Sequence, residues 1–502
     1  MAFILGIAVL LGALFFFLPR QSARLPPGPQ ALILTEILHR ALSYTPQPLW
    51  IKLREWHRRY GPLVHISLAG QRAVFVGDQS AVRDLLDKRG RIYSSRPRLV
   101  MAGEIMTAGD HIVFMPYGDK WRRHHRIQGD LLSPKAVRQY RDLMDLESLK
   151  TLHDLLSTSH MGPEDSEIIF RRYFGSLINT LAYGEPTVDN GNAPQLEEVD
   201  KIAKAFANAI DTGNWLVDSF PILKRLPSWI APFRRYGEQI HDETVKLFRA
   251  KTNAALKKGG WNWVTHTKNN AEQMDEHEFL YVIGVLYQAG VHVSVAALRH
   301  FLVACQLHPS AVDTAQQEIN SVLGPTQNMP GLDDLARLPY TSAFFREVMR
   351  WRPLTPIGAP HALVEDDDYQ GYHLPRGTLI MPNHWELDLN DGEFRPERWL
   401  TGSQPPVNVF GFGRRICPGR HLAEDALSLL MTRMLWAFKF EAPDPIDPWG
   451  FEIDASILVP HHSRALITAR DRQKSELLNR TWEAADKDVD AKLQVIGEKL
   501  SV

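Results

Sequence analysis

"FGFGRRICPGR", the stretch from Phe410 to Arg420, contains one of only two cysteines in a chain of 502 residues. The other, Cys305, lies far away in an apolar stretch, so neither a disulfide framework nor a cysteine-rich metal site is expected. Three uses then remain for Cys417 as a single thiolate: a nucleophile, a redox sensor, or an axial ligand to a large cofactor. The alternative is a buried structural cysteine in a glycine-rich turn.

The residues around Cys417 favour an anionic sulfur. The pattern after it predicts a helix that begins at about Gly419, and free N–H groups, the helix dipole and nearby arginines stabilise an anion at such a position. Gly411 and Gly413, together with Gly419, let the backbone pass close to something bulky. The local sequence therefore indicates a functional thiolate beside a large group.

Composition indicates a folded globular protein. Apolar residues make up 44% of the chain and charged residues 23%, and the length is enough for a very large core or several. The formal net charge of −1 gives no global attraction to nucleic acid, so we expect no nucleic-acid partner.

The N-terminus predicts a membrane anchor. Met1 to Pro19 contains no charged side chain, and Arg20 and Arg24 follow it. A run of this length is just enough to cross a thin bilayer, and basic residues after it place the rest of the chain in the cytosol. A cleaved signal peptide is the alternative, but its basic residues would come first. Residues 20–30, which contain "RLPPGP", are predicted to be a proline-rich hinge between anchor and body.

The remaining pattern predicts a mainly α fold with a smaller β-rich part. Alternation over residues 62–78 predicts a hairpin, and residues 79–256 have mostly helical periodicity. Residues 279–307 predict one long helix that is buried nearly all round, and residues 368–381 predict further strands. The charged tail, residues 472–502, is predicted to be an exposed and partly disordered extension.

The stretch around Cys417 also carries a family resemblance. Phe410, Gly413, Arg415, Cys417 and Gly419 fit the pattern F-x-x-G-x-R-x-C-x-G of the cytochrome P-450 superfamily. The chain resembles the eukaryotic microsomal members of this superfamily. Its local sequence is similar to that of the members that act in filamentous-fungal secondary metabolism. The resemblance implies that these five residues bind haem b and that Cys417 is the axial ligand of the haem iron.

The resemblance assigns the cytochrome P-450 fold to residues 31–471, the predicted haem-thiolate catalytic domain. "REVMR" places Glu347 and Arg350 on one helix face, where a surface ion pair is the ordinary interpretation. In the family these two residues form a buried structural triad with the arginine of "PERW", here Arg398. The linker before "PERW" is shorter than the family usually shows.

Two further stretches resemble parts of the family that contact the haem propionates. "YGDKWRRHHRI" provides Trp121, but His125 occupies the position where the family has arginine; a surface basic patch at His124 and His125 is the alternative. "RPLTPIGAPH" provides His361. With Arg415, these residues are expected to bind the propionates.

The long helix departs most from the family. Where the family reads A-G-x-(D/E)-T, this chain reads "AGVHVS" from Ala289: Gly290 is kept, while His292 replaces the acid and Val293 the threonine. The acid and alcohol normally supply protons for oxygen activation. His292, Ser294, or a substrate hydroxyl with water are the candidate replacements. A histidine satisfied in the core is the alternative for His292.

The resemblance implies a membrane-anchored monooxygenase of the endoplasmic reticulum that oxidises a lipophilic small molecule with O2. Its electrons would come from NADPH through cytochrome P-450 reductase, with cytochrome b5 as an optional second donor. Oxidative coupling, ring formation, desaturation or isomerisation is the alternative, and a non-catalytic haem protein is a third. The expected basic docking face comprises Arg122, Arg123, Arg126 and Arg420. The expected pocket segments are Val100–Ile112, Gln288–Val293, Leu354–Ala359 and Ser456–Val459.

Overall fold

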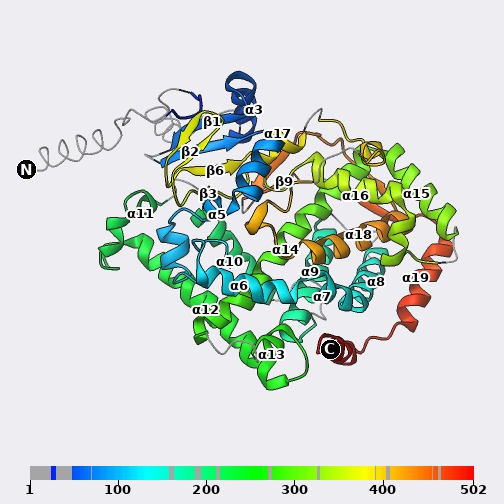
Figure 1. Ribbon diagram of the computed structural model, residues 1–502. Coiled ribbons are helices and arrows are strands. Elements are labelled where there is room, and N and C mark those ends of the chain that lie inside the picture. The colour runs from blue at the N-terminus through cyan, green and yellow to red at the C-terminus, as the bar shows by residue number, and fades with distance from the viewer. Residues whose placement is uncertain are drawn as a thin grey trace, which may run out of the picture.

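The computed structural model describes residues 24–29, 48–68, 71–157, 163–186, 194–210, 215–268, 274–324, 328–389, 392–402, 407–454, 456–461 and 465–501. Helices fill most of the body, and a small sheet lies at one edge, at the upper left of Figure 1. The prediction of a mainly α protein with a smaller β-rich part is therefore confirmed. The predicted membrane anchor, Met1 to Pro19, lies outside the described residues.

The helices follow one another along most of the chain. The α-helices are α3 Leu49–Tyr60, α4 Gln79–Val82, α5 Gly90–Tyr93, α6 Asp119–Leu131, α7 Pro134–Gln139, α8 Arg141–Ser157, α9 Pro163–Tyr183, α10 Pro194–Ile210, α11 Leu216–Ser219, α12 Pro232–Lys258, α13 Trp263–Lys268, α14 Glu276–Leu307, α15 Pro309–Leu323, α16 Pro339–Trp351, α17 His384–Leu389, α18 Arg420–Ala437, α19 Arg472–Ala484 and α20 Val489–Leu500. The shorter 3₁₀ and π segments are η1 Arg83–Lys88, η2 Val100–Ile105, η3 Pro221–Arg225, η4 Leu332–Arg337, η5 Pro396–Trp399 and η6 Gly413–Arg415.

Four strands form the main sheet, in the order β1-β2-β6-β3. The predicted hairpin is β1 Leu63–Leu68 paired antiparallel with β2 Gln71–Val76; β6 Leu379–Pro382 runs parallel to β2, and β3 His361–Ala362 is antiparallel to β6. Three two-stranded sheets complete the described strands. They are β4 Asp367–Tyr369 with β5 Tyr372–Leu374, β7 Phe438–Glu441 with β10 Leu466–Ala469, and β8 Phe451–Asp454 with β9 Ile457–Pro460.

Helix α14 is the central element of the fold (Figure 1). It begins after Asp275, whose side chain caps the helix by accepting a 2.8 Å hydrogen bond from the Glu278 N–H, and it ends before Pro309. It is the one helix among the described residues that is long and apolar enough to cross a membrane, but most of it is buried inside the protein. The predicted long buried helix is confirmed as a core helix, which packs against α9, α12, α16 and α18.

Part of the predicted hinge belongs to the folded body. The His65 N–H donates to the Pro27 carbonyl at 3.0 Å, and the His373 N–H donates to the Arg24 carbonyl at 2.9 Å. A side chain at Gly28 would lie 1.9 Å from the His65 carbonyl oxygen, so the strand passes over this position at close range. Residues 24–29 are thus fixed against β1 and β5, and the prediction of a hinge over all of residues 20–30 is wrong for this part.

The prediction of an exposed tail is also wrong. Helices α19 and α20 both pack against α8, and they bury Leu478, Leu493 and Ile496. Gly497 contributes to this packing, because a side chain there would lie 2.9 Å from Trp261. A few apolar residues at helical spacing are enough to dock a helix onto an existing surface. The overall composition of a charged stretch does not indicate these residues.

Candidate active site

The loop that carries Cys417 is turned by two glycines. Gly411 and Gly413 have φ angles of +76° and +56°, which glycine adopts readily. A Cβ at Gly413 would lie 2.1 Å from the Leu86 carbonyl oxygen, so no other residue fits there without a shift. The Cys417 N–H donates to the Phe410 carbonyl at 2.8 Å, and Gly419 is the N-cap of α18. The sulfur therefore lies at the N-terminus of α18, as the sequence predicts.

The environment of Cys417 contains opposing electrostatic effects. Burial raises the pKa of the Cys417 thiol, whereas the N–H groups of Gly419 and Arg420 and the charge of Arg420 lower it. Burial is the largest of these effects, so the pKa of the thiol is raised. The sequence around Cys417 indicates only the effects that lower the pKa of its thiol. These residues alone therefore favour the thiol, and a bound metal cation would favour the thiolate.

Two guanidinium groups lie close to this loop and are held by backbone carbonyls. Arg415 donates to the carbonyls of Ser94, Ile112 and Met115 at 2.7, 3.1 and 2.6 Å. Arg96 donates to the carbonyls of Val113, Ala359 and Pro360 at 3.0, 3.2 and 2.6 Å. Burial lowers the pKa of Arg415 to about 8 and that of Arg96 to about 10.

His361 lies beside these two arginines and forms one polar cluster with them. It is buried, and its Nδ1 lies 2.9 Å from the Tyr93 carbonyl oxygen, to which it donates. Burial, with the charges of Arg96 and Arg415, pushes the pKa of His361 well below its ordinary value. Among the described residues, no carboxylate pairs with either arginine or with His361. Arg96 and Arg415 are half-buried cations without a counter-charge among the described residues, so this cluster fits an anionic ligand such as the two propionates of haem. Sequence reasoning missed Arg96, which belongs to none of the motifs.

Trp121 and His125 lie beside Arg415. Their rings stack with centroids 4.6 Å apart, and the Arg415 guanidinium lies 4.6 Å from the centre of the Trp121 ring. Burial, together with the charges of Arg415 and Arg420, lowers the pKa of His125. A neutral His125 retains one ring N–H, so it fits the expected contact with a propionate.

The alternative of a surface patch at His124 is wrong. His124 is fully buried, and its Nε2 lies 3.2 Å from the Glu278 carboxylate. Arg123 binds the same carboxylate through both Nε and Nη2, so it is not a free surface charge. Of the expected docking arginines, Arg122 pairs with Asp119, and Arg126 is exposed.

The three residues of the expected triad meet. Glu347 accepts from Arg350 at 2.8 Å and from Arg398 at 3.1 Å, and all three side chains are buried. The Trp399 indole N–H and the Arg395 backbone N–H also donate to Glu347, at 2.9 and 2.7 Å. The carboxylate is therefore fully enclosed by donors, unlike a surface ion pair.

The structure separates the expected catalytic residues of α14. In the middle of the helix, Ala289 and Val293 are the exposed side chains, and they share one face. Gly290 lies against α9, where a Cβ would be 2.2 Å from Ile178. The hydroxyl of Ser294 donates to the Gly290 carbonyl at 2.8 Å.

The imidazole of His292 points toward a different part of the protein. Its Nε2 lies 3.6 Å from the Asp454 carboxylate in β8. Asp454 is partly exposed, so it connects this side of α14 with solvent. His292 and Ser294 thus do not share the face of Val293.

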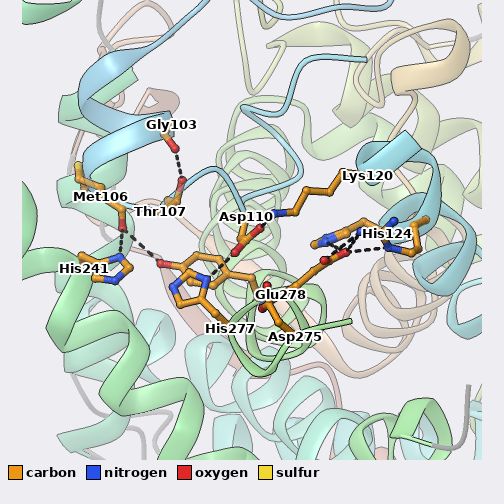
Figure 2. Close-up of polar contacts among 12 residues, drawn as sticks. Gly103, Met106, Thr107, Asp110, Lys120, His124, His241, Asp275, His277 and Glu278 are labelled. Carbon is orange, nitrogen blue, oxygen red and sulfur yellow. Dashed lines mark hydrogen bonds and ion pairs between the residues drawn. The ribbon is translucent and has the colours of Figure 1, made fainter. Parts of the chain in front are cut away.

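The segment from η2 to Asp110, part of the expected pocket wall, is fixed to α12 and α14 (Figure 2). The Met106 carbonyl lies 3.1 Å from His241 Nδ1 and accepts from the Tyr281 hydroxyl at 3.3 Å. Asp110 is buried and binds His277 at 2.5 Å and the ammonium group of Lys120. Two other expected pocket segments also meet, because the Leu458 N–H donates to the Leu354 carbonyl at 2.7 Å.

Comparison with known proteins agrees with this geometry. Residues 26–467 match the family model described as "Cytochrome P450". The chain is 39% identical to the cytochrome P450 monooxygenase aneD of Aspergillus aculeatus, over 98% of this chain and 97% of that protein. It is 38% identical to the cytochrome P450 monooxygenase drtD of Aspergillus calidoustus, over 97% and 93%, and 34% identical to fumitremorgin C synthase of Aspergillus fumigatus, over 84% and 83%. A zebrafish cytochrome P450 solved with progesterone is 22% identical with a TM-score of 0.70, over 84% of this chain and 100% of that chain.

Proposed function

Because the chain belongs to the cytochrome P450 family, a family whose named relatives are monooxygenases, we propose that it is a membrane-anchored haem-thiolate monooxygenase. Its substrate is a lipophilic small molecule, oxidised during fungal secondary-metabolite biosynthesis. Electrons come from NADPH through cytochrome P-450 reductase, with cytochrome b5 as an optional second donor. The catalytic domain lies on the cytosolic side of the endoplasmic reticulum membrane.

The observation that carries this proposal is the pairing of one half-buried thiol at a helix N-terminus with two half-buried guanidinium groups that have no carboxylate partner among the described residues. Haem bound here would supply the reductive activation of O2. Cys417 would ligate its iron, and Arg96, Arg415 and His361 would hold its propionates. Trp121 and His125 would complete this contact. Phe410, Gly413 and Gly419 shape the loop, and Glu347, Arg350 and Arg398 fix the chain beside it.

Proton supply is the part of the site that departs from the family. His292 is the residue of α14 that is placed to exchange protons with solvent, since its imidazole lies beside the partly exposed Asp454. The Ser294 hydroxyl donates its hydrogen bond to the Gly290 carbonyl. Gly290 itself allows α14 to pack closely on α9. Water or a substrate hydroxyl would complete the route to the face formed by Ala289 and Val293.

An exposed apolar patch supports membrane association. Its side chains lie on α11, η3 and the segment before α12, and they are Leu216, Phe220, Ile222, Trp229 and Ile230. Trp229 is 76% exposed, and Lys224 and Arg225 lie within the same segment. Apolar side chains with neighbouring basic residues are typical of a surface that lies in the lipid headgroup region.

A haem-thiolate reaction without oxygen insertion is the second candidate function. It is favoured by Val293, an apolar side chain that is 38% exposed on the face where the family has a hydroxyl. Coupling, ring formation, desaturation or isomerisation would each place different demands on proton supply than hydroxylation does.

One experiment distinguishes these functions. The full-length protein in membranes is supplied with reductase, NADPH, ¹⁸O₂ and a fungal metabolite extract, and products are identified by mass spectrometry. A product that contains one ¹⁸O atom supports the monooxygenase. A product that has changed without gaining ¹⁸O supports the second function. The absence of any product that depends on the protein, with or without NADPH, would contradict both.

A further inference from the structure

A buried carboxyl group connects α17 to the start of the Cys417 loop. Asp388 in α17 and Asn408, three residues before Gly411, are each 4% exposed. The Asn408 side-chain amide donates to Asp388 Oδ1 at 2.6 Å. The other oxygen, Oδ2, is buried and has no hydrogen-bond partner among the described residues. A buried carboxyl group that is only half satisfied is costly, so its position needs an explanation.

Each end of this bridge is itself fixed. The Arg350 guanidinium, which pairs with Glu347, also donates to the backbone carbonyls of Asp388 and Glu393, both at 2.6 Å. At the other end, the Asn408 carbonyl accepts from the Gly411 N–H at 2.8 Å, at the turn that brings Cys417 back to the Phe410 carbonyl. Contacts therefore run without a gap from the ion pair in α16 to the loop.

The sequence around this bridge explains why it is needed. Only residues 390–395 join α17 to η5. Arg350 donates to the carbonyl of Asp388, just before this short connection, and to that of Glu393, within it. The ion-pair network holds this connection through its backbone. The hydrogen bond between the Asp388 and Asn408 side chains joins this connection to the loop before Cys417.

We propose that Asp388 is a positioning residue for the Cys417 loop, which holds Asn408 in register with the Glu347–Arg350 ion pair so that the sulfur is presented to the haem iron. The proposal rests on the proposed function, because it concerns the same thiolate. Its mechanism is a neutral hydrogen bond: Asn408 donates, and a carbonyl-type oxygen at position 388 accepts. Asparagine at position 388 would provide the same acceptor without a charge.

The first test is spectroscopic and uses the full-length haem protein. Asp388→Ala and Asn408→Ala should each lower the fraction of the reduced CO complex that shows the thiolate-type Soret band, and the double variant should be no worse than either single variant. Asp388→Asn should retain the wild-type fraction. Asn179→Ala is the matched control, since Asn179 is buried and donates an equally short bond of 2.6 Å, to the Glu185 carbonyl, from α9. The Asn179→Ala variant should lower the free energy of unfolding without changing the fraction that shows the thiolate-type Soret band.

The second test does not depend on the haem spectrum. Hydrogen exchange of the peptide over residues 407–420 should be about tenfold faster in Asp388→Ala than in Asp388→Asn, because the loop loses a buried hydrogen bond. Equal exchange in both variants, or an unchanged Soret band in both alanine variants, would overturn the proposal. Loss of the band in Asp388→Asn would overturn it as well. A wild-type protein without the band would instead contradict the proposed function, and the exchange test would still decide the role of Asp388.

Discussion

Arg96 shows at the scale of one residue how the fold prepares for an anionic ligand. Its guanidinium is held by three backbone carbonyls, and burial lowers its pKa to about 10. A charge-assisted hydrogen bond contributes about 1.5–3 kcal/mol, so Arg96→Met should weaken haem binding by about 10–100-fold. The haem-free protein should lose little stability, because the lost hydrogen bonds are offset by removal of a half-buried charge without a carboxylate partner.

Transfer of haem to an acceptor protein measures this affinity. Arg98→Met is the control, because Arg98 is mostly exposed and pairs with Glu104 at the surface. Equal haem retention in the Arg96→Met variant and the wild type would contradict the assignment of Arg96 to a propionate.

Asp388 gives a prediction for pH dependence. Burial raises the pKa of Asp388 from 3.8 to about 7. The folded state therefore favours the protonated carboxyl group, and the stability it contributes is fully present below pH 3.8 and is lost as the pH rises toward 7. Asp388→Asn stays neutral, so its stability relative to the wild type should increase between these pH values, by about 1–4 kcal/mol. Thermal unfolding at a series of pH values checks this, and parallel curves for the two proteins would contradict it.

Sequence reasoning predicted the residues that belong to local motifs and missed those that act through long-range contacts. Glu347, Arg350 and Arg398 could be predicted because each lies in a short pattern, and the structure brings them together. Arg96 and Asp388 have roles only because segments distant in sequence fold against them. His124 was assigned to an alternative surface patch because the sequence does not show that Glu278 lies opposite it.

At the scale of elements, the packing of α14 on α9 depends on Gly290. A Cβ there would lie 2.2 Å from Ile178 Cδ1, closer than two carbon atoms can approach. Gly290→Ala should therefore destabilise the protein by about 1–3 kcal/mol, the usual cost of overpacking. Adding Ile178→Val removes that methyl group and should recover part of the loss. The midpoint of thermal unfolding measures both effects, and a Gly290→Ala variant as stable as the wild type would contradict this packing role.

The sequence indicates some of the helices and strands but not how all of them pack. The long helix, the hairpin of β1 and β2 and the strands β4 to β6 were predicted because their periodicity is strong and local. Docking of α19 and α20 was not predicted, because it rests on Leu478, Leu493 and Ile496 within a charged stretch. The fixed position of residues 24–29 depends on backbone bonds to β1 and β5, which proline content does not indicate.

At the scale of the whole molecule, we expect two contacts with the membrane: the N-terminal apolar run and the exposed patch between α11 and α12. Deleting Met1 to Pro19 should release much of the protein from membranes without loss of haem. Adding Trp229→Glu to the deletion should reduce the remaining bound fraction further, because Trp229 is 76% exposed in the patch. Flotation with liposomes measures each fraction. Complete retention of the doubly changed protein would contradict this account of the membrane surface.

The absorption spectrum of the reduced CO complex of Cys417→Ser tests the central claim most directly. Both cysteines of the chain are free, and Cys305 is buried in α14, so Cys305→Ser is the matched control. If Cys417 is the axial thiolate, Cys417→Ser should lose the thiolate-type Soret band, and Cys305→Ser should keep it. An unchanged band in Cys417→Ser would contradict the haem-thiolate assignment.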